Sequence, residues 1–181
     1  MLAGLVHPVR AAPLFVPVAG IDNLSAMTIT VVDAGPRRVS RAAEVHAPAA
    51  DIFEIVASPA RHRELDGSGT VADSVSGPER LTQGAKFTVK MRQHGFPYRI
   101  TSTVTEFDDG RVVEWQHPLG HRWRWELRPS ADHSTLVTET FDYSQLSPIK
   151  VRGLDLYGAP RQNAAGIEAT LRKLQDRYSA S

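Results

Sequence analysis

The segment over residues 134–143 carries the side chain whose chemistry the sequence indicates most sharply, the carboxylate of Glu139. Apolar and polar residues alternate there as in a half-buried strand, so Glu139 shares the inward face with Val137, Phe141 and Tyr143. A buried carboxylate must be paired, hydrogen-bonded or neutralised, and burial raises its pKa. Such a group suits acid–base catalysis or the anchoring of a ligand hydroxyl. A salt bridge to an arginine of a neighbouring strand, or the opposite parity with Glu139 in water, is the alternative.

Two histidines, His117 and His121, flank a Pro-Leu-Gly turn, where they could transfer protons or bind a metal. They do not share a helix face, no HExxH motif occurs, and no carboxylate stands at ligand spacing. His117 therefore joins Glu139 as a candidate catalytic residue. Residues 66–69 lack the lysine and spacing of a phosphate cradle, and we interpret them as a helix stop before a strand. We expect no metal and no cofactor.

Tryptophan is concentrated on two neighbouring predicted strands, residues 111–117 and 121–128. Alternation places Trp115, Trp123 and Trp125 on the inward face. Large aromatic side chains on a concave face are typical of an apolar pocket, but they also fill solid cores, and both interpretations stay open. The candidate ligand-binding residues are Tyr98, Trp115, His117, Trp123, Trp125, Glu139, Phe141 and Tyr143.

An antiparallel sheet would position these residues. Alternating segments bounded by turns predict seven strands, at residues 37–46, 70–76, 85–94, 98–107, 111–117, 121–128 and 134–143. Pro48 and the pair Ser58-Pro59 begin two short helices after the first strand. Short strands joined by tight turns form a meander, so the fold class is α+β.

The C-terminal segment predicts one long helix that begins near Pro160. Its apolar residues recur at helical spacing and form a single stripe, made of Ala164, Ile167, Leu171, Leu174 and Tyr178. We expect this stripe to cover the inward face of the sheet. A coiled-coil dimer would give the same spacing, which leaves a homodimer open.

Alternate turns of a meander lie at the same end of its sheet. The turns at 94–97 and 117–121 and the exit after residue 143 therefore share one rim, which collects His94, Phe96, Tyr98, His117, His121 and Tyr143. The opposite rim holds only turn residues, Asp108, Asp109, Ala131 and Asp132. We expect the mouth of a cavity at the aromatic rim, with residues 144–158 crossing near it as a lid.

Composition excludes several classes of protein. The chain has 181 residues, enough for one domain, and its net charge is 21 − 20 = +1, which argues against a nucleic-acid partner. Cysteine is absent, so disulfides and thiol chemistry are excluded, and no apolar run is long enough to span a membrane. Prolines and Arg10 interrupt the apolar N-terminus, so we expect residues 1–35 to be a disordered extension, residues 36–181 to be the domain, and the protein to be cytoplasmic.

Several stretches resemble a known superfamily. They are residues 45–49 (VHAPA), 64–71 (ELDGSGTV), 97–101 (PYRIT), 123–127 (WRWEL), 138–143 (TETFDY), 158–160 (GAP) and 167–171 (IEATL). Together they resemble the START-like, or SRPBCC, superfamily, and within it the polyketide cyclase/dehydrase and lipid-transport proteins. The resemblance spans about residues 37–178 and implies a helix-grip fold, in which a curved seven-stranded sheet wraps around the C-terminal helix. It also implies a cavity between them for sterols, lipids, polyketides or similar molecules.

Three functions compete on this basis. A carrier or sensor of a small hydrophobic ligand (lipid, polyketide or isoprenoid-like) needs only the cavity and its lid, and we prefer it slightly. A polyketide cyclase/dehydratase-type enzyme would use Glu139, His117 or Tyr98 to move protons. A protein-interaction module would use a basic outer strand face, formed by Arg122, Arg124 and Arg128.

Overall fold

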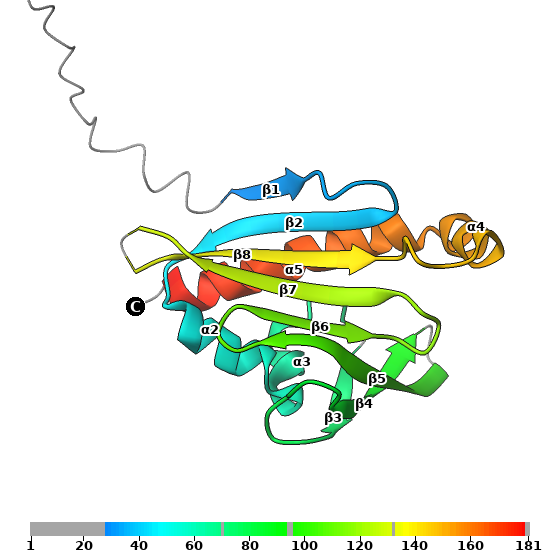
Figure 1. Ribbon diagram of the computed structural model, residues 1–181, viewed down its shortest axis with the longest axis horizontal. Coiled ribbons are helices and arrows are strands. Elements are labelled where there is room, and N and C mark those ends of the chain that lie inside the picture. Colours follow the sequence, from blue (N-terminus) through cyan, green and yellow to red (C-terminus); the bar gives the residue numbers. More distant parts are fainter. Residues whose placement is uncertain (1–27, 70, 94–95, 132, 180–181) are drawn as a thin grey trace, which may run out of the picture.

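The computed structural model describes residues 28–69, 71–93, 96–131 and 133–179, and their strands form one antiparallel sheet. The spatial order is β1-β2-β8-β7-β6-β5-β4-β3, with the long helix α5 (Ala159–Ser179) behind the sheet (Figure 1). In chain order the strands are β1 (Ile29–Val32), β2 (Arg38–Val45), β3 (Val71–Ser76), β4 (Lys86–Gln93), β5 (Phe96–Asp108), β6 (Val112–Gln116), β7 (Arg122–Pro129) and β8 (Thr135–Asp142).

The chain order confirms the α+β class and the helix-grip arrangement. Strand β2 is followed by three short helical segments, α2 (Ala49–Val56), the 3₁₀ turn η1 (Pro59–Arg61) and α3 (His62–Leu65). Strands β3 to β8 then form a meander, and β2 joins it at β8. All seven predicted strands are present, as β2 to β8. The predicted apolar stripe of the last helix is also present, since Ile167, Leu171 and Leu174 are buried in the core.

An eighth strand, β1, lies where the sequence analysis expected a disordered extension. It pairs antiparallel with β2, with Ile29 opposite Ala43, so residues 29–32 belong to the sheet. Val31 is exposed on this edge strand, and four residues with so little burial leave almost no alternation to detect. Residues 1–27, His94 and Asp132 lie outside the described residues, and the domain boundary at residue 36 stays an expectation.

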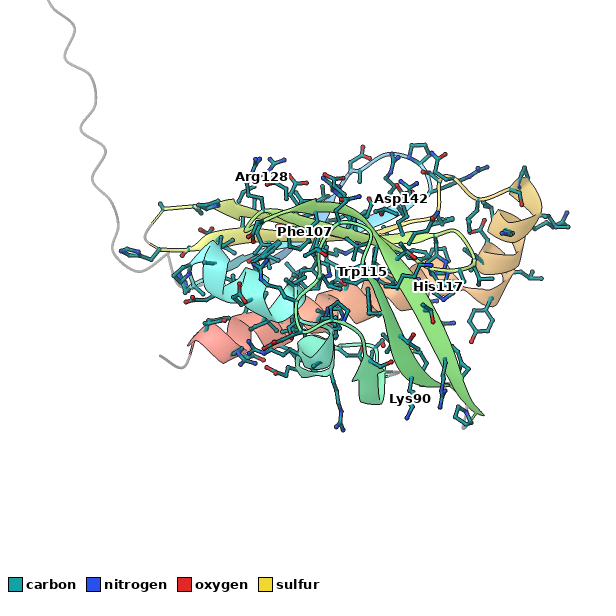
Figure 2. All side chains as sticks on the ribbon, turned by 60° about the horizontal axis from the view of Figure 1, so that its bottom comes forward. Lys90, Phe107, Trp115, His117, Arg128 and Asp142 are labelled. Atoms are coloured by element: carbon teal, nitrogen blue, oxygen red, sulfur yellow. The ribbon has the colours of Figure 1, made fainter. Side chains whose placement is uncertain are left out.

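The strand registers settle which side chains point inward. Trp125 lies opposite both Val113 and Glu139, and residues directly opposite in neighbouring strands share a face of the sheet. Val113 and Trp125 are buried in the core that packs against α5. Figure 2 shows Trp115 between the sheet and α5, whereas Arg128 and Asp142 lie on the opposite, outer face. The predicted inward parity of β6, β7 and β8 is therefore confirmed.

A helix occupies most of the segment that was predicted to cross near the rim. Helix α4 (Pro148–Tyr157) begins with proline at its first position and ends at Gly158, whose φ of 74° closes the helix in a left-handed conformation. Figure 1 shows α4 projecting beyond the end of the sheet. Val151 is buried in the hydrophobic core, so one side of α4 packs against the rest of the domain.

The loop at residues 66–69, which follows α3, packs tightly against α5. The backbone N–H of Gly67 donates to Thr170 Oγ1 at 3.0 Å. A Cβ at Gly67 would lie 2.3 Å from the backbone nitrogen of Thr170, so only glycine allows this approach. The Asp66 carboxylate accepts hydrogen bonds from the N–H groups of Ser68 and Val71 and holds the loop in shape. The segment is the predicted helix stop and strand entry.

Candidate functional site

Glu139 is the chemically distinctive group of the inward face. Its side chain is only 6% exposed, and Oε2 has no hydrogen-bond partner among the described residues. Burial, with a smaller contribution from the nearby Asp66 carboxylate, raises the pKa of Glu139 from 4.5 to about 8. The carboxyl group is therefore mostly protonated at neutral pH and can donate a hydrogen bond from inside an apolar surface.

A neighbouring arginine does not neutralise this carboxyl group. The register places Arg41 of β2 opposite Glu139, but Arg41 Nε donates instead to Glu168 Oε1 of α5 at 2.9 Å. Its Nη1 donates to the carbonyl oxygen of Ser40. The salt-bridge alternative considered for Glu139 is therefore wrong for this arginine, and so is the alternative that places the carboxylate in water.

Aromatic rings form a continuous contact chain from the rim into the sheet. The rings of His117 and His121 stack with centroids 4.2 Å apart, and His121 meets the edge of Phe141 at 5.1 Å. Phe141 in turn contacts Trp123 at 5.1 Å and stacks on Tyr143 at 5.4 Å. Three predicted ligand-binding residues, Trp123, Phe141 and Tyr143, thus lie in contact around Phe141, and His121 links His117 to them.

His117 and His121, the two histidines of this aromatic series, are disposed to stay neutral. Burial and the adjacent His117 lower the pKa of His121 to about 3, and burial lowers the pKa of His117. His117 Nδ1 accepts a hydrogen bond from the N–H of Leu119 at 3.1 Å. His121 Nδ1 is buried and has no partner among the described residues. A neutral imidazole that already accepts a hydrogen bond is poorly suited as an acid at neutral pH.

The structure does not bring the two candidate catalytic residues together. His117 N–H donates to the His121 carbonyl oxygen across the turn, so both histidines lie at one level of the sheet. Glu139 lies opposite Trp125, four residues further along β7, which is roughly 13 Å along a strand. Glu139 and His117 therefore cannot exchange a proton directly.

Trp115 sits in a second aromatic cluster. Its ring stacks on His62 of α3 at 5.2 Å and meets Phe87 of β4 edge-on at 5.6 Å. His62 Nε2 donates to the carbonyl oxygen of Val56 at 2.8 Å, and burial lowers the pKa of this histidine. Sequence reasoning missed His62, because nothing in its spacing indicates that a short helix folds beneath β6.

The inward tryptophans differ in how completely they are covered. Trp125 is buried, whereas Trp115 and Trp123 stay partly exposed although they point inward. Tyr98, the remaining candidate, lies near the start of β5 opposite Met91. Its pKa is raised by burial and by the nearby Tyr157 of α4. The inward face is thus incompletely covered towards the aromatic rim and α4.

Two surface hollows lie elsewhere. One, of about 370 Å³, lies between the outer sheet face, the β6–β7 turn and α4, and its lining includes Lys86, Thr103 and Lys150. The other, of about 360 Å³, crosses the outer face of β2, β8 and β7. Neither is lined by an inward tryptophan or by Glu139, so the enclosed cavity beneath the sheet stays a prediction.

The predicted basic outer face is charge-compensated. Arg122 pairs with Glu114 at 3.4 Å, Arg124 pairs with Glu106, and Arg128 pairs with Glu126. Glutamates of other strands pair with Arg122 and Arg124, and Glu126 of the same strand pairs with Arg128. Acidic residues of β5, β6 and β7 thus point to the same side as the arginines, and the use of this face by a protein partner stays a prediction.

The sheet, the gripped helix and the inward aromatic face together define a helix-grip protein. The chain belongs to the polyketide cyclase/dehydrase and lipid transport family, whose model matches residues 36–179. The uncharacterized protein Rv0088 of Mycobacterium tuberculosis strain H37Rv is 58% identical over 156 residues, which cover 84% of this chain and 69% of that protein.

Solved structures show the same fold at low sequence identity. A protein from Arthrobacter aurescens matches with a TM-score of 0.62 and 15% identity, covering 86% of this chain and 93% of that one. An AHSA1-like protein from Aeromonas hydrophila matches with a TM-score of 0.53 and 15% identity, covering 79% and 92%. Within the described residues, no helix is both long and apolar enough to cross a bilayer.

Proposed function

We propose that the inward face binds a small hydrophobic molecule of the lipid, polyketide or isoprenoid kind, and that the protein is a carrier or sensor of that molecule. The observation that carries this proposal is Glu139, a buried carboxyl group whose Oε2 has no partner among the described residues. A buried polar atom left unsatisfied is costly, and a ligand atom in hydrogen-bond reach would remove that cost. The family to which the chain belongs supports the same class of ligand.

The protonation of Glu139 specifies the polar group of the ligand. Because its pKa is raised to about 8, the carboxyl group donates at neutral pH and prefers an acceptor such as a ketone, ester or carboxylate oxygen. Trp125 lies opposite Glu139, and the partly exposed Trp123 lies two residues nearer to the rim. A ligand would therefore lie along β7, with its carbonyl oxygen at Glu139 and its apolar body on the aromatic chain.

An enzyme of the cyclase or dehydratase type is the second candidate, and Glu139 is again the observation that favours it. A carboxyl group with a raised pKa can protonate and deprotonate carbon and oxygen. His117 lies too far along the strand to assist directly. We therefore rank binding without turnover first.

A carbonyl-bearing fluorescent probe tests this proposal. Prodan, a naphthalene ketone, should bind saturably, and Glu139→Leu should weaken binding about tenfold, as expected when a buried hydrogen bond is lost. Glu139→Gln keeps a donor and should bind within a few-fold of wild type. Glu126→Leu, on the outer face of β7, is the matched control and should leave binding unchanged.

Two results would contradict the proposal. One is the absence of saturable prodan binding, and the other is equal affinity in wild type and Glu139→Leu. Rising pH provides a further check, because ionisation of Glu139 removes the donor and should weaken prodan binding as the pH passes about 8.

A further inference from the structure

Helix α4 is apolar on two sides. Val151 is buried and Leu154 packs against the core. Ile149 and Leu156, seven residues apart and thus on one face of the helix, are 81% and 89% exposed. Gly153 lies between them, and a Cβ added there would meet only open space. The outer face of α4 is therefore an apolar surface without a cover among the described residues.

Neighbouring segments extend this apolar surface. Leu119, at the β6–β7 turn, is 54% exposed, and Tyr157, the last residue of α4, is 51% exposed. Lys150 Nζ of α4 donates to the Leu119 carbonyl oxygen at 3.0 Å, which ties the helix to the turn. We call the four exposed side chains the rim patch: Leu119, Ile149, Leu156 and Tyr157. Figures 1 and 2 both place α4 at the far end of the molecule, where nothing else stands in front of it.

Basic side chains lie beside the rim patch. Lys86, Leu119 and Lys150 line a common hollow at the β6–β7 turn. The charged side chains of α4 are Lys150, Arg152 and Asp155, so with Lys86 the cations at this end outnumber the acidic group. The rest of the outer sheet carries arginines paired with glutamates, so this end differs in having cations in excess beside exposed apolar groups.

We propose that the rim patch docks the protein on the surface of an anionic lipid bilayer. Exposed aliphatic and aromatic side chains enter the boundary between headgroups and acyl chains, while the flanking lysines and arginines attract anionic headgroups. The cations favour a bilayer over a second copy of this chain as the partner of the rim patch, because a second copy would bring the same positive charge to the contact and be repelled. Helix α4 lies close to the aromatic rim, since, after burial, Asp155 contributes to the raised pKa of Tyr143 and Tyr157 to that of Tyr98. Docking through α4 would therefore bring the aromatic rim to the bilayer.

Vesicle flotation tests this docking without any ligand of the inward face. The probe is an equimolar mixture of phosphatidylcholine and phosphatidylglycerol, compared with phosphatidylcholine alone, at low and high salt. Wild type should float with the anionic vesicles and be released by salt. Ile149→Ser combined with Leu156→Ser should weaken binding at least about tenfold. Lys150→Glu combined with Arg152→Glu should weaken binding to the anionic vesicles specifically.

The matched control is Val31→Ser combined with Leu136→Ser, which removes two exposed apolar side chains far from the rim patch and should bind as wild type does. Failure of wild type to float with anionic vesicles, or equal flotation of the Ile149/Leu156 variant, would overturn the proposal. A dimer seen by light scattering that the same variant dissociates, without vesicle binding, would assign the patch to a second copy instead. Prodan binding is scored separately, so either proposal can fail alone.

Discussion

Glu139 holds its proton at neutral pH because the fold places a carboxyl group opposite Trp125, with Arg41 engaged by Glu168. Desolvation without a cationic partner favours the neutral form. The group is therefore a buried hydrogen-bond donor, and the proposed binding function depends on this one property.

The free energy of unfolding should depend on pH through the protonation of Glu139. Its pKa rises from 4.5 to about 8 on folding, so the stabilisation it supplies is complete below pH 4.5 and is lost as the pH climbs to about 8. Glu139→Gln does not ionise. Its free energy of unfolding relative to wild type should therefore increase across this interval, by at most about 1.4 kcal/mol per pH unit. Urea denaturation at several pH values measures this difference, and a difference independent of pH would contradict it.

His121 should give a pH dependence of the opposite sign. Its pKa falls from 6.5 to about 3 on folding, so its contribution is intact above pH 6.5 and is lost as the pH falls towards 3. His121→Phe keeps an aromatic ring against Phe141 and does not titrate. The variant should gain stability relative to wild type as the solution is acidified, as thermal unfolding can show. If the two proteins lose stability in parallel, His121 is not held neutral by the fold.

The orientation of single side chains was predictable from the sequence where polar and apolar residues alternate along a strand. The inward position of Glu139 and of the three tryptophans followed from period-two spacing. Contacts between distant segments were not predictable, because no local pattern encodes them. The stack of His62 on Trp115 and the pairing of Arg122 and Arg124 with glutamates are of this kind.

At the scale of elements, the loop at residues 66–69 fixes α3 against α5, and its glycine can be tested directly. Gly67→Ala would push a Cβ to within 2.5 Å of the Gly166 carbonyl oxygen and should destabilise the protein by about 1–3 kcal/mol. Gly153→Ala, on the open face of α4, should instead stabilise by about 0.5–1 kcal/mol. Chemical denaturation compares the two, and similar effects of both substitutions would show that the Gly67 contact does not matter.

Two elements were missed for different reasons. Strand β1 carries too few buried residues for its alternation to be visible, and only pairing with β2 defines it. Helix α4 has a typical start signal, Pro148, and a typical end signal, Gly158. Its apolar residues lie on both the buried and the exposed side of the helix, so the sequence shows no single apolar stripe. Because the sequence analysis looked for a single apolar face, it predicted residues 144–158 to be a lid and not a helix.

At the scale of the whole molecule, the described chain covers its inward face unevenly. Helix α5 buries the face at β2 and β8, whereas Trp115 and Trp123 stay partly exposed. The same end of the molecule carries α4 and the rim patch. We infer that a ligand enters from this end, where aromatic rings lead from His117 towards Glu139.

The indole N–H signals of the protein, followed by ¹H–¹⁵N NMR during titration with prodan, test the binding proposal most directly. The chain holds 3 tryptophans, and all of them point inward, so each indole signal reports on the proposed site. Saturable shifts of Trp115 and Trp123, weakened in Glu139→Leu, are the predicted result. Unmoved indole signals at concentrations that perturb amides of the outer face would contradict the account.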